Sequence, residues 1–388
     1  MKAILETPKV KLFLDSIGRN SQGSKKTFGS ILGVFQDFLT TKYGENHNCE
    51  TMIQTVSKNE INIYELLDAF VSYLLATRPN LTPKSISLYL TAIRSYFGYY
   101  DIDVISSKFK RRVRIPKCYR EDEKPLDVSD IRKILLSCSN RRLKPYILTL
   151  ASGGMRALEG LAIRLCDIDF TSTPTKIHIR KEFVKTRMAR DIYISDEATH
   201  YLRQWIDWKY RDKRRKNRER TKRDSDLVFS RFSRDEKNNP KMLYSRIMIE
   251  FQNLLEAVGM DKRKEEGVYK RREITLHSFR RFVKTVISNQ VNQDYSEWFL
   301  GHAKSPYYTI KESGKREIYA TKCMKYLTFL DYTTLEARGK SIDANLQEKE
   351  KEIEELRHND KVKEDALATL SDQVMKLMVE VQEIKKLK

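Results

Sequence analysis

Apolar residues recur every three or four positions over much of the first 110 residues, as they do in helices with one buried face. The clearest case begins at Thr82, a residue type that caps helix starts, followed by Pro83, which suits the first helical position. The next apolar residues share one helical face: Ile86, Leu90, Ile93 and Phe97. The pattern predicts a small helical domain over residues 1–112.

A second pattern begins at residue 125 and mixes helical spacing with two short alternating segments. Residues 177–179 and 192–194 alternate as strands do, and the polar residues 185–190 between them suit the tip of a hairpin. Asp127 or Ser129 can cap the first helix of this unit. We therefore predict a mainly α fold with a small antiparallel β-sheet. A second, larger domain, the candidate catalytic domain, covers residues 125–340, and a basic linker covers residues 113–124.

The last 48 residues, 341–388, differ in kind because their apolar residues follow a heptad repeat. The a and d positions of one unbroken register hold Leu346, Ile353, Leu356, Leu367, Leu370, Val374, Leu377, Val381 and Ile384. An isolated helix cannot bury such a stripe, so the pattern predicts a coiled coil that associates with a second copy. The alternative is a helix that folds back on its own protein.

Charge narrows the choice of partner. The chain has 74 Lys and Arg against 53 Asp and Glu, a net charge of +21. Such a surplus attracts polyanions, and nucleic acid is the first candidate. A membrane surface competes with it, but we find no long apolar run, signal peptide or lipidation motif, so we expect a cytoplasmic, nucleoid-associated protein. Five scattered cysteines without a CxxC predict neither a disulfide framework nor a zinc site.

Four groups along the second unit could together exchange a phosphodiester bond without a metal. Such chemistry needs a nucleophile, cations for the phosphate oxygens and an acid for the departing sugar oxygen. Arg156 follows a Gly153-Gly154 break, and Arg280 comes one helical turn after His277. Leu300-Gly301-His302 is followed closely by Tyr307 and Tyr308. Arginine suits a phosphate because it is permanently charged and can bond two oxygens at once.

This ordered set, with Lys185 of the hairpin between Arg156 and His277, resembles the signature of the tyrosine recombinase (phage integrase) family. The resemblance spans nearly all of residues 125–338, and residues 1–112 are similar to the family's core-binding domain. It implies a C-shaped clamp on double-stranded DNA and a 3′-phosphotyrosine intermediate, with no metal or nucleotide cofactor. It also implies a homo-oligomer, a tetramer on two paired sites.

The resemblance also implies a role for each residue of the set. Arg156 and Arg280 would hold the scissile phosphate, and Lys185, in the hairpin, would protonate the leaving 5′ oxygen. His277 and His302 would bond the phosphate or tune its protonation, and Glu159 would orient the site. Lys181 and Arg187 are rivals of Lys185, because a hairpin register cannot be fixed from sequence.

The nucleophile departs from the family pattern, since the position where the family usually has its tyrosine is Lys311 here. We favour Tyr308, with Tyr307 close behind it. The later candidates Tyr319, Tyr326 and Tyr332 lie in apolar surroundings that favour a packing role. The departure leaves open an unusual active-site loop, delivery of the tyrosine to a neighbouring protomer, or lost catalysis.

Three functions therefore compete at this stage. The first is a site-specific integrase of a mobile element. The second keeps the chemistry in a resolvase or a type IB topoisomerase-like enzyme. The third is an architectural or regulatory DNA-binding protein that has the fold without the reaction.

Overall fold

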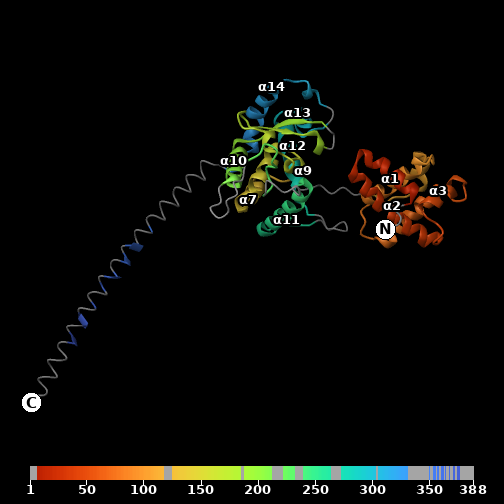
Figure 1. The fold of residues 1–388 in the computed structure, drawn as a ribbon, viewed down its shortest axis with the longest axis horizontal. Coiled ribbons are helices and arrows are strands. Elements are labelled where there is room, and N and C mark those ends of the chain that lie inside the picture. The colour runs from red at the N-terminus through yellow and green to blue at the C-terminus, as the bar shows by residue number, and fades with distance from the viewer. Residues whose placement is uncertain are drawn as a thin grey trace, which may run out of the picture. The chain divides into compact units, whose positions relative to one another are not determined.

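The computed structural model describes residues 7–117, 125–184, 188–211, 222–231, 239–263, 272–302 and 305–330, with single positions between 349 and 375. The chain divides into two compact units. The N-terminal unit comprises Met1–Lys124 and also Gly259–Thr275, and the C-terminal unit comprises Pro125–Val258 and Leu276–Lys388. Figure 1 shows helices in both units and the small sheet within the second.

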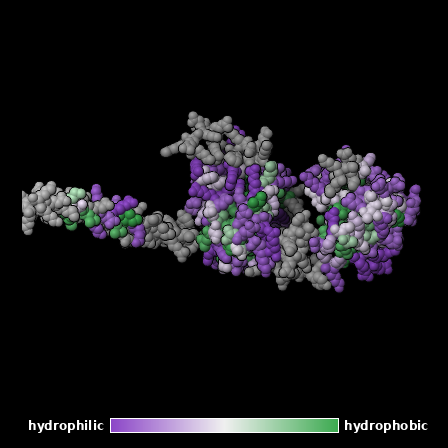
Figure 2. Space-filling model, turned by 90° about the horizontal axis from the view of Figure 1, so that it is seen from below, coloured by the Kyte–Doolittle hydropathy of each residue, from purple (hydrophilic) through white to green (hydrophobic). Residues whose placement is uncertain are grey.

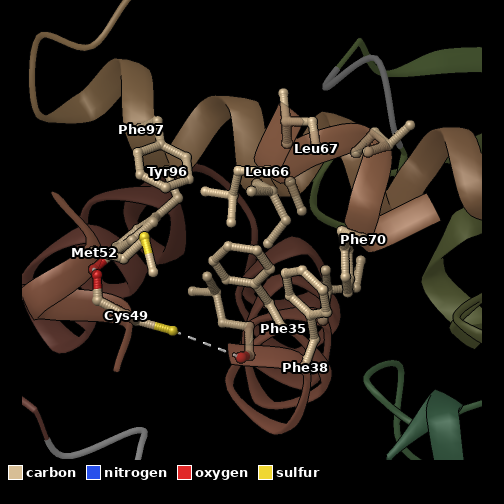
Figure 3. Close-up of a cluster of buried hydrophobic side chains, with 14 of the residues drawn as sticks. Phe35, Phe38, Cys49, Met52, Leu66, Leu67, Phe70, Tyr96 and Phe97 are labelled. Carbon is tan, nitrogen blue, oxygen red and sulfur yellow. Dashed lines mark hydrogen bonds between the residues drawn. The ribbon is translucent and has the colours of Figure 1, made fainter. Parts of the chain in front are cut away.

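Six helices form the described part of the N-terminal unit: α1 (Pro8–Asn20), α2 (Gln22–Tyr43), α3 (Cys49–Ser57), α4 (Ile63–Thr77), α5 (Pro83–Tyr99) and α6 (Ser106–Arg112). The predicted start of α5 is confirmed, because the Thr82 side chain accepts a hydrogen bond from the backbone N–H of Ser85. Apolar faces of these helices meet in one core. Its centre is aromatic: Phe35 and Phe70 pack edge to face with ring centroids 5.1 Å apart, beside Phe38 (Figure 3).

The described helices of the C-terminal unit are α7 (Val128–Ser137), α8 (Leu143–Gly153), α9 (Ala157–Leu161), α10 (Asp196–Tyr210), α11 (Pro240–Val258), α12 (Leu276–Gln290), α13 (Gln293–Leu300) and α14 (Glu312–Ile318). Helix α8 is buried along almost its whole length and packs against α10 and α12. It is the central helix of this unit.

Three short strands form the antiparallel sheet of this unit in the order β1 (Ile168–Asp169), β2 (Lys176–Ile179) and β3 (Arg190–Tyr193). Ile177 on β2 lies opposite Ile192 on β3, and both side chains are buried. The predicted mainly α fold with a small antiparallel sheet is confirmed. On the face of the two units that Figure 2 shows, most of the coloured surface residues are hydrophilic.

Part of the heptad segment is described at single helical positions. The apolar ones are exposed: Ile353, Leu356, Leu367, Leu370 and Val374. Leu346, Leu377, Val381 and Ile384 lie outside the described residues. The coiled coil therefore stays a prediction. Among the described residues, no helix is long and apolar enough to cross a membrane.

Candidate active site

Arg156 is placed by the break that ends α8. Gly154 has a φ of +61°, and a Cβ there would lie 2.8 Å from Cγ1 of Val283, so both backbone and packing require glycine. The chain turns at this point and α9 begins directly after Arg156. Nη1 of Arg156 donates to Oε1 of Glu159 at 2.7 Å, and its backbone N–H donates to Oε2 at 3.0 Å. Glu159 thus fixes both the backbone and the side chain of Arg156.

Glu159 is a buried carboxylate shared between two arginines. Its side chain is fully buried, and Oε2 also accepts a hydrogen bond from Nη2 of Arg190 at 2.8 Å. Burial alone would raise the pKa of Glu159, but the charge of Arg190 and hydrogen bonds from Arg190 and Arg156 lower it below its ordinary value. The carboxylate is therefore ionised and pairs with both guanidinium groups.

Arg280 lies in the first half of α12 and is 5% exposed. Its Nη1 donates to the carbonyl of Gly154 at 2.9 Å, and its Nη2 donates to the carbonyl of Leu300 at 2.7 Å. These carbonyls lie at the C-terminal ends of α8 and α13, where helices leave acceptors unpaired. Burial, and then the nearby charge of Arg156, lower the pKa of Arg280 to about 9, so it remains a cation at neutral pH.

His302 joins this group through the end of α13. Gly301, at φ +78°, terminates the helix, and Nε2 of His302 then lies 3.2 Å from Nη2 of Arg280. The other ring nitrogen, Nδ1, is bonded to the carboxylate of Glu297, which also pairs with Lys284 at 2.7 Å. The imidazole is therefore held between a carboxylate and a guanidinium. His277 lies in the first turn of α12 and is exposed.

The two favoured tyrosines lie in the short 3-10 helix η4 (Pro306–Tyr308). The hydroxyl of Tyr308 donates to the carbonyl of His302 at 3.0 Å, whereas the Tyr307 hydroxyl accepts a bond from Asn292. Burial raises the pKa of Tyr308, and the charge of Arg190 partly offsets this rise. Tyr308 is thus tied to the same loop as His302.

The other sequence candidates lie elsewhere or outside the described residues. The Tyr319 side chain is fully buried and donates to the carbonyl of Ser152, as a packing residue would. Tyr326 is 40% exposed, so the packing role expected for it is wrong: its segment is a short 3-10 helix, Met324–Leu327, that turns this ring outward. Lys185, Arg187 and Tyr332 lie outside the described residues. Lys181 is exposed just after β2.

Three residues that contact the candidate site residues or their partners were not predicted from the sequence: Arg190, Glu297 and Lys284. Arg190 left a usable signal, since it shares a strand face with the buried Ile192 and an arginine on a buried face needs a partner. Lys284 left none, because only the packing of α12 against α13 brings it to Glu297, whereas Glu297 lies five residues before His302 and meets it through the local turn at Gly301.

The site gathers three guanidinium groups, those of Arg156, Arg190 and Arg280, near the carboxylate of Glu159, while the carboxylate of Glu297 pairs with His302 and Lys284. Positive charge is therefore in excess, and the arrangement suits an anion with several oxygens, such as a phosphate. Among the described residues, no group of three or more His, Cys, Asp or Glu could hold a metal ion.

Residues 124–309 match the phage integrase family. This stretch contains every residue of the arginine network and both favoured tyrosines. The matched stretch largely coincides with residues 125–338, the part of the chain in which the sequence resemblance was found.

Individual relatives cover shorter stretches. Tyrosine recombinase XerA of Saccharolobus solfataricus is 30% identical over 125 residues, which is 32% of this chain and 39% of the relative. Transposase A from transposon Tn554 of Staphylococcus aureus is 22% identical over 158 residues, 39% of this chain and 44% of that protein. The chain thus matches less than half the length of either relative.

Two solved structures are similar at low identity. The crystal structure of XerA recombinase is 17% identical, with 80% of this chain and 96% of that chain covered, at a TM-score of 0.35. A structure of lambda integrase residues 75–356 bound to DNA is 14% identical, with 73% and 95% covered, at a TM-score of 0.43. Because both scores are low, the assignment rests on the family match and on the residues of the site.

Proposed function

We propose that the chain is a site-specific DNA recombinase, an integrase that cuts and rejoins double-stranded DNA through a 3′-phosphotyrosine, without metal or nucleotide. One observation carries this proposal. Within the family-matched residues 124–309, Glu159 holds Arg156, Arg280 hydrogen-bonds His302, and the Tyr308 hydroxyl bonds the His302 carbonyl. These are the groups that metal-free phosphoryl transfer needs.

In this proposal Arg156 and Arg280 bind the non-bridging oxygens of the scissile phosphate. Both are fixed before DNA arrives, Arg156 by Glu159 and Arg280 by the carbonyls of Gly154 and Leu300. Donors that need no rearrangement stabilise the charge that develops on phosphorus oxygens most effectively. His302, held by Glu297, accepts a hydrogen bond from Nη2 of Arg280 through its Nε2 at 3.2 Å and so helps to orient that guanidinium toward the same phosphate.

Tyr308 is the nucleophile in this mechanism. The phenol gives its proton to water, the phenolate oxygen attacks phosphorus, the bond to the 5′ oxygen breaks, and the leaving oxygen takes a proton from Lys185. The products are a 3′-phosphotyrosine and a free 5′-hydroxyl, so attack by another 5′-hydroxyl restores the DNA without an external energy source. In the described structure the Tyr308 hydroxyl is bonded to the His302 carbonyl, and this bond must open before attack.

The rest of the chain fits the same proposal. Residues 1–112 serve as a core-binding domain, residues 113–124 as a basic linker along DNA, and residues 125–340 as the catalytic domain. The net charge of +21 favours contact with many phosphates. Four protomers on two paired sites, acting at the nucleoid, complete the proposal.

The test of this function is a covalent adduct formed without metal. The full chain is incubated, in EDTA, with a pool of nicked DNA duplexes whose central region is randomised, and adducts are recovered after denaturation with detergent. We expect a protein–DNA band that is enriched for one sequence and unaffected by EDTA. No adduct with any duplex that the protein binds, or a strict need for magnesium, would contradict the proposal and favour a DNA-binding protein without the reaction.

We also propose that residues 341–388 form a coiled coil that joins protomers. The exposed apolar positions in the described part of this segment, among them Leu367 and Leu370, support it, because water would otherwise cover a continuous apolar stripe.

Deleting residues 341–388 is expected to weaken self-association and joining of two DNA sites more than binding to one site. The sharper variant is Leu367→Asp with Leu370→Asp, which places charge on the predicted seam. Lys361→Asp, at a polar heptad position, is the matched control and should change nothing. Sedimentation of the free protein measures the effect, and an unchanged sedimentation profile in the double variant would refute the coiled coil.

A further inference from the structure

Arg190 connects two parts of the site that the reaction must keep at a fixed spacing. It is the first residue of β3 and is 4% exposed. Its Nη2 donates to Oε2 of Glu159 at 2.8 Å, and its Nε donates to the carbonyl of Phe299 at 3.0 Å. Glu159 in turn holds Arg156, and Phe299 lies in the last turn of α13, just before His302.

The contact with α13 is a close one. A Cβ on Gly301 would lie 2.6 Å from Nη1 of Arg190, so this glycine is required for the guanidinium to lie against the helix end as well as for the positive φ. Nη1 itself is buried and has no hydrogen-bond partner among the described residues. An unpaired buried donor is costly, which indicates that the position is kept for something other than stability. Arg190 is also near enough to Tyr308 for its charge to act on the phenol.

We propose that Arg190 is a positioning residue of the recombination reaction: it sets the spacing between Arg156, held through Glu159, and the loop that carries His302 and Tyr308. The inference rests on the proposed function and assigns it an additional residue. Arg190 itself need not touch the DNA.

Lysine should not replace arginine in this role. The guanidinium bonds Glu159 and the Phe299 carbonyl through two nitrogens set at a fixed angle, whereas a lysine ammonium is a compact charge on a flexible stem. Arg190→Lys keeps the positive charge and removes the fixed geometry. This variant therefore distinguishes an effect of the guanidinium geometry on positioning from an effect of the positive charge alone.

Arg142 supplies a matched control. It is 2% exposed, pairs with a glutamate, Glu250 of α11, and also has buried nitrogens without a partner among the described residues. Arg142→Lys therefore removes the same chemical group from a similar environment, in an ion pair that does not involve Glu159 or α13. Any loss of stability common to buried arginines should occur in both variants.

The experiment measures single-turnover adduct formation by wild type, Arg190→Lys and Arg142→Lys on the enriched nicked duplex, with equal amounts of folded protein. Because a displacement of about 1 Å can cost roughly a hundredfold in rate, we expect Arg190→Lys to react about a hundredfold more slowly while binding the duplex normally. Arg142→Lys should react at the wild-type rate. Equal rates in the two variants would overturn the inference.

Amide hydrogen exchange provides a readout that needs no reaction. The N–H groups of Gly301 and His302 donate to Trp298 and Glu297 at the end of α13, and we expect them to exchange faster in Arg190→Lys but not in Arg142→Lys. Unchanged exchange at these two amides would overturn the inference even if the chain recombines DNA. If exchange changes as expected but wild type forms no adduct, the link through Arg190 stands and the proposed function fails.

Discussion

Replacing Arg280 with alanine is expected to slow strand cleavage by about a thousandfold or more while leaving most DNA binding intact. In the proposed mechanism the removed group donates to the transition state from a buried position where water cannot substitute for it. Losing one such donor typically costs about a hundredfold to a thousandfold in rate. Arg280 also donates to His302, so its loss removes a hydrogen-bond partner of that imidazole as well.

Alanine at this position has a structural cost as well. It leaves the carbonyls of Gly154 and Leu300 without their donor, and an unpaired buried group costs about 1–3 kcal/mol. Arg280→Lys keeps the charge and is the second variant, expected to fold better and still cleave poorly, because one ammonium cannot reach both carbonyls and the phosphate.

The measurement is the rate of adduct formation at saturating DNA, with thermal unfolding recorded in parallel. Arg281→Ala is the matched control, since it removes an arginine from the next position of α12, whose Nη2 donates to the Ser278 hydroxyl at 3.2 Å. We expect it to cleave DNA normally. A folded Arg280 variant that cleaves at the wild-type rate would remove Arg280 from the mechanism.

The features that the sequence predicted are local ones. The start of α5 follows from Thr82 and Pro83, and the start of α7 from Asp127, whose side chain accepts from the N–H of Asp130 at 2.7 Å. The strand pair follows from alternation of apolar residues at 177–179 and 192–194. Each of these needs only neighbouring residues to be specified, so a pattern in the chain is sufficient.

The contacts of the site depend on tertiary packing instead. Arg280 could be predicted as a site residue from its motif, but its hydrogen bonds to the ends of α8 and α13 could not. The bond to Gly154 joins residues more than a hundred positions apart in the chain. The ion pair of Lys284 with Glu297 likewise joins two different helices, α12 and α13. No local pattern encodes these geometries, although the inward-facing Arg190 could have been noticed from strand alternation.

Tyr308→Phe is expected to abolish the covalent adduct. The substitution removes the attacking oxygen and keeps the ring, so only the hydrogen bond to the His302 carbonyl is lost, at a cost of about 1 kcal/mol. The variant should therefore fold and bind DNA. Burial raises the pKa of Tyr308, so the reactive phenolate is scarce at neutral pH. Its population grows as pH rises, and wild-type cleavage should therefore accelerate from neutral to alkaline pH.

Tyr307 is the natural control, because it lies next in the chain and its hydroxyl is bonded to Asn292 rather than to the loop of His302. Tyr307→Phe should retain the adduct. Loss of the adduct in both variants would indicate that η4 must be intact, without identifying the nucleophile.

Peptide mapping of the trapped adduct tests the central claim most directly. The wild-type adduct formed in EDTA is digested with nuclease and protease, and mass spectrometry locates the residual nucleotide. We expect it on Tyr308, through a phosphate linked to the 3′ end, in wild type and in Tyr307→Phe. A nucleotide on any other residue, or an adduct that persists in Tyr308→Phe, would contradict the account.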